Sequence, residues 1–336
     1  MRSWSKQILK FLVFLCISVF LFWLVYRDQD WSNLRKALKE DVSYGWVAVV
    51  CVVGMLSHVA RALRWQLLTL SMGCPIRLMN SFFGVMIGYF ANLALPRMGE
   101  FTRCGVVSKY EHVPFSKLLG TVVTERIIDV FFLLAYTAAV IVFQFRDILF
   151  FLDTNKGVEE KIVSWVYSWK TGVLIVAVPL LLYGVWRWSR GTMLQKRLGG
   201  FLNGLKEGIL TIRKVEHMWL FVLYSVLIWV LYFLMFYFCF FCFEFTSHLG
   251  IMAGMTVFVF GSFGMVAPVQ GGIGAWHFMV ISALLLYIPH TPEMESMAKT
   301  FAFLTHGVMT SVYIIAGIVC LIALPLYNAA IKKLNC

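Results

Sequence analysis

Apolar stretches of roughly 20 residues recur along this chain, and each is about long enough to cross the hydrocarbon core of a bilayer as a helix. Hydrophobic residues make up 60% of the 336 positions, whereas charged residues make up only 14%. An ordinary soluble domain carries about 25% charged residues. A chain with so few charges cannot cover itself with a water-facing surface. The sequence therefore predicts an all-α polytopic integral membrane protein.

The apolar stretches predict a single transmembrane domain over residues 1–336, with about six full spans and two interrupted regions. The spans are expected at about residues 8–26, 44–62, 118–143, 171–187, 218–243 and 301–326. The interrupted regions cover about 80–108 and 250–288. The sequence LPRMGE breaks the first at 95–100, and PVQGGIG breaks the second at 268–274.

Basic residues predict the orientation of the chain in the membrane. The formal net charge is +12, but Lys and Arg collect in short segments between apolar runs, beside Trp and Tyr. That placement is typical of cytoplasmic loops, and it argues against nucleic acid as a partner. Arg61, Arg64 and Arg77 follow the second span, and seven more basic residues lie between 187 and 217. We place these segments and both termini in the cytoplasm.

This orientation implies that each interrupted region enters and leaves on one side of the membrane. Both ends of 78–117 are then cytoplasmic, whereas 244–248 and 289–299 lie outside. The sequence thus predicts two re-entrant helical hairpins that enter from opposite faces and meet near the midplane. Paired Pro/Gly-interrupted segments in the two halves of a chain indicate a transporter site. A pair of short spans in place of each hairpin would keep the same parity, and this alternative remains open.

The break in the first hairpin carries ionisable residues, which usually have a function inside a membrane segment. Glu100 lies three residues from each of two arginines, and a helix that begins near 99 would present free N–H groups to an anion. Guanidinium groups also suit phosphate. We expect a lipid head-group site here, although an internal salt-bridge clasp is the alternative. The residues are Asn92, Pro96, Arg97, Gly99, Glu100 and Arg103.

The sequence TERIIDV places a second charged cluster, Glu125, Arg126 and Asp129, inside a predicted span. Glu125 and Asp129 share a helix face at i,i+4 spacing, and Arg126 lies three residues before Asp129. We expect an ion network that closes against the first cluster. A network that only fixes the helix register is an equal alternative.

The second hairpin offers polar groups for the same head-group site, namely Gln270 and His277. The hairpin is broken at Pro268, Gly271, Gly272 and Gly274. Consecutive glycines allow close backbone approach. The sequence contains no nucleotide-binding or cofactor motif. Cys239 and Cys242 have the spacing of a metal site, but they lie in an apolar run and are better explained by packing.

At these stretches the chain resembles the lysylphosphatidylglycerol synthase transmembrane-region family, which includes the flippase half of the bacterial multiple peptide resistance factor. The matching segments are RALRW (61–65), GYFANLALPRMGEFTRCG (88–105), TVVTERIID (121–129) and PVQGGIGAWHF (268–278). The resemblance implies two facing hairpins, the residues above as a shared core, and the bacterial cytoplasmic (inner) membrane. The family commonly has an acidic residue where His277 stands, and often an arginine near His306. The identity of the head group is therefore not implied.

The expected function is a flippase-like translocation or binding of an anionic or phosphate-bearing lipid, with membrane lipids as partners. One alternative is a non-catalytic membrane partner of a lipid-modifying enzyme. Another is a membrane-embedded lipid-linked transferase with Glu100 or Asp129 as base. We expect no soluble aminoacyl-transfer domain in this chain, and therefore no tRNA-dependent aminoacylation.

Overall fold

The structure is a computed structural model that describes residues 2–144, 215–267 and 269–334. Its described part is helical, as expected for an all-α polytopic membrane protein. The predicted span 171–187, most of the basic segment 187–217, and Pro268 lie outside the described residues.

Four described helices are long and apolar enough to cross a membrane. They are α3 (Tyr44–Leu70), α6 (Phe115–Phe143), α11 (Met218–Phe238) and α15 (Pro292–Leu334). Each coincides with a predicted span, although α3 and α15 extend well beyond the predicted limits. The first predicted span lies within α1 (Arg2–Tyr26), and the short α2 (Trp31–Glu40) follows it.

The first interrupted region forms a helical hairpin, called here the first hairpin, of α4 (Leu78–Ala94) and α5 (Met98–Glu111). The helices pack against each other, and the turn between them is short. Leu95 is extended because it precedes a proline, and Arg97 adopts the left-handed conformation with φ 61°. The Asn92 side chain closes the turn by accepting a hydrogen bond from the Gly99 N–H at 2.6 Å.

The second interrupted region forms the second hairpin, of α13 (Ile251–Val266) and α14 (Ala275–Leu284). The segment between them contains a short 3-10 turn, η3 (Gln270–Gly272). Gly271, Gly272 and Gly274 all have positive φ angles, between 57° and 84°. A β-carbon at Gly274 would collide with Leu21 and Phe22 of α1. Glycine at this position therefore lets α1 pack against the turn.

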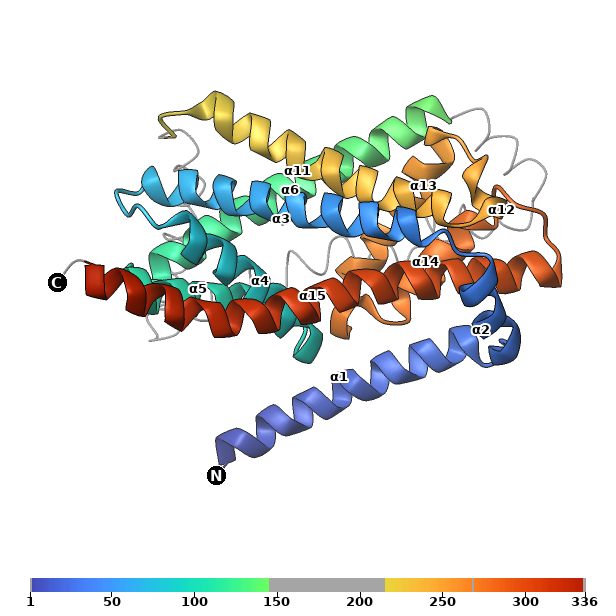
Figure 1. Ribbon diagram of the computed structural model, residues 1–336, viewed down its shortest axis with the longest axis horizontal. Coiled ribbons are helices and arrows are strands. Elements are labelled where there is room, and N and C mark those ends of the chain that lie inside the picture. Colours follow the sequence, from blue (N-terminus) through green and yellow to red (C-terminus); the bar gives the residue numbers. More distant parts are fainter. Residues whose placement is uncertain (1, 145–214, 268, 335–336) are drawn as a thin grey trace, which may run out of the picture.

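The chain repeats one arrangement in two opposite directions. In each half, a long helix is followed by a hairpin and then by a second long helix. Figure 1 shows that α3 and α11 lie side by side with opposite directions, and that the two hairpins start from opposite ends of the molecule. The first hairpin packs against α15 of the other half, and the second packs against α6. Such an inverted arrangement is a common architecture of transporters.

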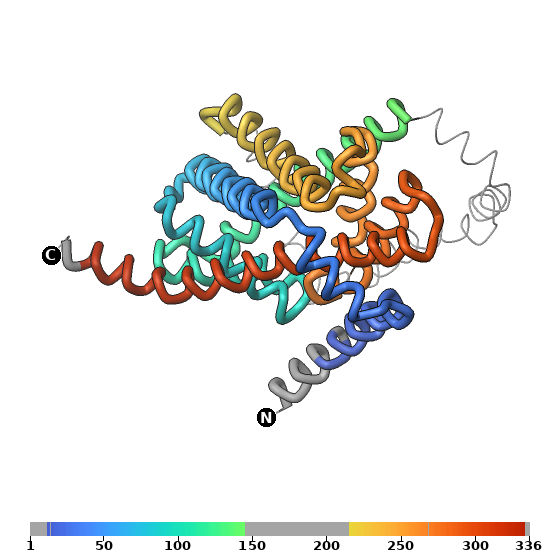
Figure 2. The backbone as a smooth tube through the Cα atoms, turned by 45° about the vertical axis from the view of Figure 1, so that its right-hand side comes forward, coloured from blue at the N-terminus to red at the C-terminus, as the bar shows by residue number. Residues whose placement is uncertain are grey.

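The two hairpins meet at their tips, in the middle of the molecule (Figures 1 and 2). Arg97 in the first tip donates from Nη2 to the Val266 carbonyl at 3.2 Å, and Gln270 in the second tip donates from Nε2 to the Ala94 carbonyl at 2.9 Å. Val266 and Ala94 are the last residues of α13 and α4, whose carbonyls lack intrahelical partners. Each tip therefore satisfies the open end of the other hairpin.

The lengths of α4 and α13 are compatible with the predicted re-entrance. The 17 residues of α4 and the 16 of α13 correspond to about 26 and 24 Å of helix. The hydrocarbon core of a bilayer is about 30 Å thick. Re-entrance from opposite faces remains a prediction.

Replacing Gly99 with alanine is expected to destabilise the protein by about 1–3 kcal/mol, the usual effect of overpacking. A β-carbon there would collide with the Gly88 carbonyl oxygen and would lie 2.7 Å from the Asn92 side chain, so the hairpin could not close. Gly105 in the same helix is the matched control, since its β-carbon would meet nothing within 4 Å. Thermal unfolding in detergent should show a loss for Gly99→Ala and none for Gly105→Ala; equal effects would contradict this packing.

Candidate functional site

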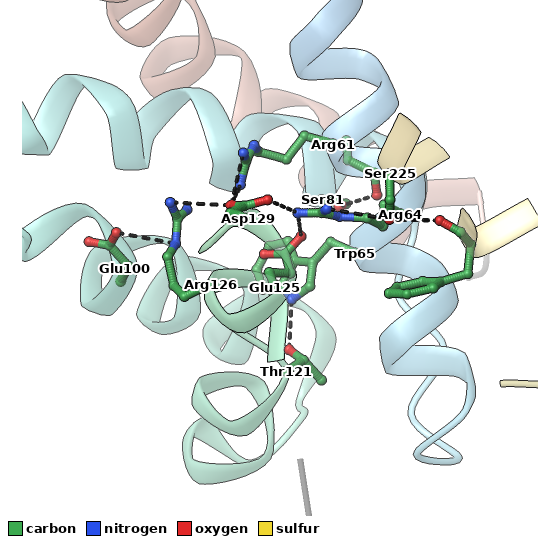
Figure 3. A network of polar contacts seen from close by, with 12 residues as sticks. Arg61, Arg64, Trp65, Ser81, Glu100, Thr121, Glu125, Arg126, Asp129 and Ser225 are labelled. Carbon is green, nitrogen blue, oxygen red and sulfur yellow. Dashed lines mark hydrogen bonds and ion pairs between the residues drawn. The ribbon is translucent and has the colours of Figure 1, made fainter. Parts of the chain in front are cut away.

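Charged side chains from α3, α5 and α6 form one network beside the first hairpin (Figure 3). Among the described residues it contains four arginines and three carboxylates. They are Arg61, Arg64, Glu100, Arg103, Glu125, Arg126 and Asp129. The network joins the two charged clusters, which lie apart in the sequence.

Asp129 is the centre of the network. Its Oδ2 accepts from Nη1 and Nη2 of Arg61 at 3.1 and 3.2 Å, and its Oδ1 accepts from Arg64 Nη2 at 2.9 Å. Arg126, three residues earlier on α6, lies 3.5 Å away. Arg61 and Arg64 are buried, with 2% and 0% of their surface exposed. Carboxylate and guanidinium groups at this depth therefore depend on one another for polar partners.

Glu125 forms the second centre. It is fully buried, it is ion-paired with Arg103 of α5, and its other oxygen lies 3.6 Å from Arg64. The Arg103 guanidinium also stacks over the ring of Trp65 at 4.6 Å, and the Trp65 indole N–H donates to Thr121 at 2.8 Å. Arg103 is thus part of the interior, where it couples the first hairpin to α6.

The positions of Arg61 and Arg64 correct the sequence analysis, which used them as charges of a cytoplasmic loop. Helix α3 continues to Leu70, so both side chains lie inside the protein. Their spacing of three residues puts them on one helix face. The apolar residues that follow Trp65 in WQLLTL were the signal that the helix continues.

Glu100 and Arg126 form the open edge of the network. Arg126 Nε lies 3.7 Å from Glu100 Oε1, which is an ion pair but not a close hydrogen bond. The Arg126 side chain remains 46% exposed. The other carboxylate oxygen of Glu100, Oε2, is buried and accepts no hydrogen bond from the residues that the structure describes. Glu100 lies three residues from Arg97 and from Arg103 in the sequence, but its ion pair in the structure is with Arg126.

The open edge lies deep along a candidate membrane span. Arg126 is 11 residues after the start of the 29-residue helix α6, or about 16 Å along its axis. Val130, one turn further along α6, is an exposed apolar residue, and so are the adjacent Ile127 and Phe131. The network also has one arginine more than it has carboxylates. Within the described residues, a formal positive charge is therefore left over beside an apolar surface.

The remaining candidate residues are engaged in holding the turns. Asn92 caps α5, Gln270 bonds to the first hairpin, and the His277 Nδ1 accepts from the Gly274 N–H at 3.2 Å. Arg97 is exposed and reaches the second hairpin by one hydrogen bond. His306 of α15, which the sequence analysis noted only as a departure from the family, bonds to the Gly271 carbonyl at 2.8 Å.

Comparisons with known proteins agree with this architecture. The chain is 29% identical over 175 residues to the UPF0104 membrane protein MJ1595 of Methanocaldococcus jannaschii, which covers 51% of this chain and 49% of that protein. The match therefore spans about half the length of the curated relative. No solved structure matches the chain significantly. The profile of the lysylphosphatidylglycerol synthase TM region matches residues 7–334. The chain therefore belongs to the lysylphosphatidylglycerol synthase TM region family.

Proposed function

We propose that this protein binds the phosphate-bearing head group of a membrane lipid at the open edge of the network and moves that lipid across the bilayer. One observation carries the proposal: Arg126, far along a candidate membrane span, is 46% exposed and only loosely paired. An exposed charge at membrane depth costs several kcal/mol unless an opposite charge meets it. A lipid phosphate is the anion that the surroundings supply.

The chemistry of arginine suits this ligand. A guanidinium group is planar, keeps its charge, and can donate two parallel hydrogen bonds to phosphate oxygens. In the network the Arg126 guanidinium faces Glu100 and Asp129 at 3.7 and 3.5 Å, beyond good hydrogen-bond distance. A phosphate at the exposed edge would give Arg126 the close partner that these carboxylates do not.

Glu100 adds a preference for the rest of the head group. Its Oε2 is buried and accepts no hydrogen bond within the described part of the chain, which is costly for a carboxylate oxygen. A hydroxyl or ammonium group next to the phosphate would supply that donor. A head group such as glycerol phosphate carries both features, since it joins a phosphate to hydroxyl groups.

The opposed hairpins supply a path for movement. Non-helical backbone at membrane depth is stable only inside protein or beside a wet cavity. Here the non-helical turns lie against each other, and side-chain hydrogen bonds of Arg97 and Gln270 join them. A separation of the tips that opens one side at a time would have to break these hydrogen bonds, each of which contributes about 1 kcal/mol.

The test is transport of labelled phosphatidylglycerol between the leaflets of proteoliposomes. We expect Arg126→Gln to reduce the rate to the protein-free background, because a glutamine keeps a polar side chain but removes the charge that holds the phosphate. Arg35→Gln is the matched control, since Arg35 is an exposed arginine of the short helix α2, away from the network. It should transport like the unmodified protein.

Both variants must first elute as folded protein in detergent. If Arg126→Gln transports lipid as fast as the unmodified protein, the assigned head-group site is wrong. No transport of any anionic phospholipid by the unmodified protein would rule out translocation, and would favour a binding role beside a lipid-modifying enzyme.

A further inference from the structure

Two histidines meet behind the turn of the second hairpin. His277 is the third residue of α14, and His306 lies on α15; their ring centroids are 4.6 Å apart. Both are buried, with 3% and 8% of their surface exposed. Each bonds to the backbone of the turn between α13 and α14, at Gly274 and Gly271 respectively.

The hydrogen bonds to the turn indicate which ring nitrogens carry protons. The Gly274 N–H can only donate, so the His277 Nδ1 that accepts from it carries no proton. The Gly271 carbonyl can only accept, so His306 Nε2 carries a proton and donates it. The remaining His306 nitrogen, Nδ1, lies 3.3 Å from the Thr310 hydroxyl, which can donate to it. The turn as observed therefore fits two neutral imidazoles.

The histidine pair has a counterpart in the first half of the chain. Glu100 is the third residue of α5, as His277 is of α14, and each faces the long helix that follows its hairpin. Glu100 pairs with Arg126 on α6, and His277 lies against His306 on α15. One half of the inverted arrangement thus has an acid–base pair at this position, and the other half has two histidines that can gain protons.

Few other ionisable groups face the pair from the elements around it. From α1, the Tyr26 ring lies 5.5 Å from that of His277, and its hydroxyl donates to the Lys299 carbonyl. On α15, Lys299 lies two turns before His306 and is paired with Glu295 at 2.9 Å. Helix α13 and η3 contain no ionisable residue, and His277 is the sole one in α14. On the first hairpin, Arg97 bonds to Val266 beside the turn.

We propose that His277 and His306 form a proton-binding site that controls whether the tip of the second hairpin stays closed. A proton that binds His277 forms an N–H bond at Nδ1 and breaks the hydrogen bond from Gly274. A second proton on His306 would place two positive charges on rings whose centroids are 4.6 Å apart in an apolar site, which is unfavourable. An opened tip would let water reach both rings, so the open state binds protons more tightly than the closed state.

Linkage then gives the direction of the effect. A ligand stabilises the state that binds it more tightly, so acid favours opening of the tip. In the proposed lipid cycle, on which this step rests, the proton would be the coupling ion. A tenfold higher proton affinity in the open state would make opening up to about tenfold more frequent in acid.

Substitutions can remove the titration and keep the bonds. Asparagine places an oxygen near the position of the imidazole Nδ1 and can accept from Gly274, whereas glutamine places an N–H near Nε2 and can donate to Gly271. His277→Asn/His306→Gln therefore keeps both contacts without a titrating group. His290→Gln is the matched control, because His290 is exposed in the connection between α14 and α15.

Hydrogen exchange of peptides over 269–278, in lipid nanodiscs, measures opening of the tip without any transport. Rates at about pH 8 and about pH 5, on either side of the ordinary histidine range, are corrected for the intrinsic dependence of exchange on pH. We expect the corrected rate to rise about tenfold in acid for the unmodified protein and for His290→Gln, and to stay constant for His277→Asn/His306→Gln.

A rise of the same size in His277→Asn/His306→Gln would overturn the proposal, and so would a constant rate in the unmodified protein. The lipid transport assay at both pH values separates the two proposals. An acid-dependent tip in a protein that transports no lipid would refute translocation but keep the proton site. Lipid transport by a protein whose tip does not respond to pH would refute the proton site but keep translocation.

Discussion

Asp129→Ala should lower the free energy of unfolding by about 3–5 kcal/mol, the effect of removing one partner from a buried ion pair. Asp129 is the acceptor for Arg61 and Arg64, which are both buried, and it lies 3.5 Å from Arg126. Without the carboxylate, Arg61 would lose its charged partner and would keep the hydrogen bond to the Tyr232 hydroxyl as its remaining one among the described residues. The formal surplus of the network would rise by one positive charge. Unfolding by SDS titration in mixed micelles measures this change.

A surface carboxylate is the control for Asp129. Asp28 pairs with Arg27 at 3.1 Å, but its side chain is 75% exposed. Exposed ion pairs contribute little to stability, so Asp28→Ala should unfold like the unmodified protein. A loss for Asp129→Ala no larger than that of Asp28→Ala would contradict the network as the element that joins α3 to α6.

Charge compensation distinguishes a lost charge balance from a lost contact. Asp129→Ala/Arg61→Leu removes one acid and one base, and leucine is apolar and suited to the interior. The double variant should recover part of the stability, because fewer buried charges remain unpaired. The interaction between the two substitutions is then non-additive, as expected for residues in contact. Strict additivity would show that the two side chains act independently.

Hydrophobic length predicted the elements of the fold well, but it did not predict where their charges lie. The long apolar helices and the two broken regions follow directly from runs of apolar residues and from Pro and Gly. The end of α3 did not. Arg61 and Arg64 look like loop charges because sequence shows only that they follow an apolar run. Their burial depends on Asp129, 68 and 65 positions later along the chain.

The sequence indicated most of the residues of the charged network, but it did not indicate which of them form ion pairs. Glu100, Arg103, Glu125, Arg126 and Asp129 do belong to one cluster. Spacing in the sequence places Glu100 three residues from Arg97 and three from Arg103. In the structure, contacts between helices decide the partners, so Arg103 turns inward to Glu125 and Glu100 meets Arg126. Local spacing cannot rank a partner on another helix.

The relation between the two hairpins also depends on tertiary contacts. The sequence indicates a break in each half, and it does not indicate that each tip bonds to the last carbonyl of the other hairpin's first helix. The two tips therefore share a closed state. When either tip opens, the carbonyl of Val266 or of Ala94 loses the hydrogen bond that it accepts. If the proposed lipid cycle is correct, the two tips would separate together, which makes them the place to block it.

A cross-link between the tips should therefore stop lipid transport in a reversible way. Ala94→Cys and Gln270→Cys put thiols at positions whose native groups are joined by a 2.9 Å hydrogen bond. The variant is made in a background that lacks the eight native cysteines and still transports. Bridging by a short, reducible thiol cross-linker should reduce transport to the protein-free background, because the tips can no longer separate. Reduction should restore the rate.

The base of the first hairpin provides the matched cross-link. Asn80 and Asn328 exchange hydrogen bonds at 3.0 and 2.8 Å, which ties the start of α4 to the end of α15. A separation at the tips does not require movement at this base, so a bridge between Asn80→Cys and Asn328→Cys should leave transport intact. If both bridges block transport, the first hairpin moves as a whole against α15. If the tip bridge leaves transport unchanged, lipid passes without separation of the tips, and the contact between Gln270 and Ala94 is a permanent part of the fold.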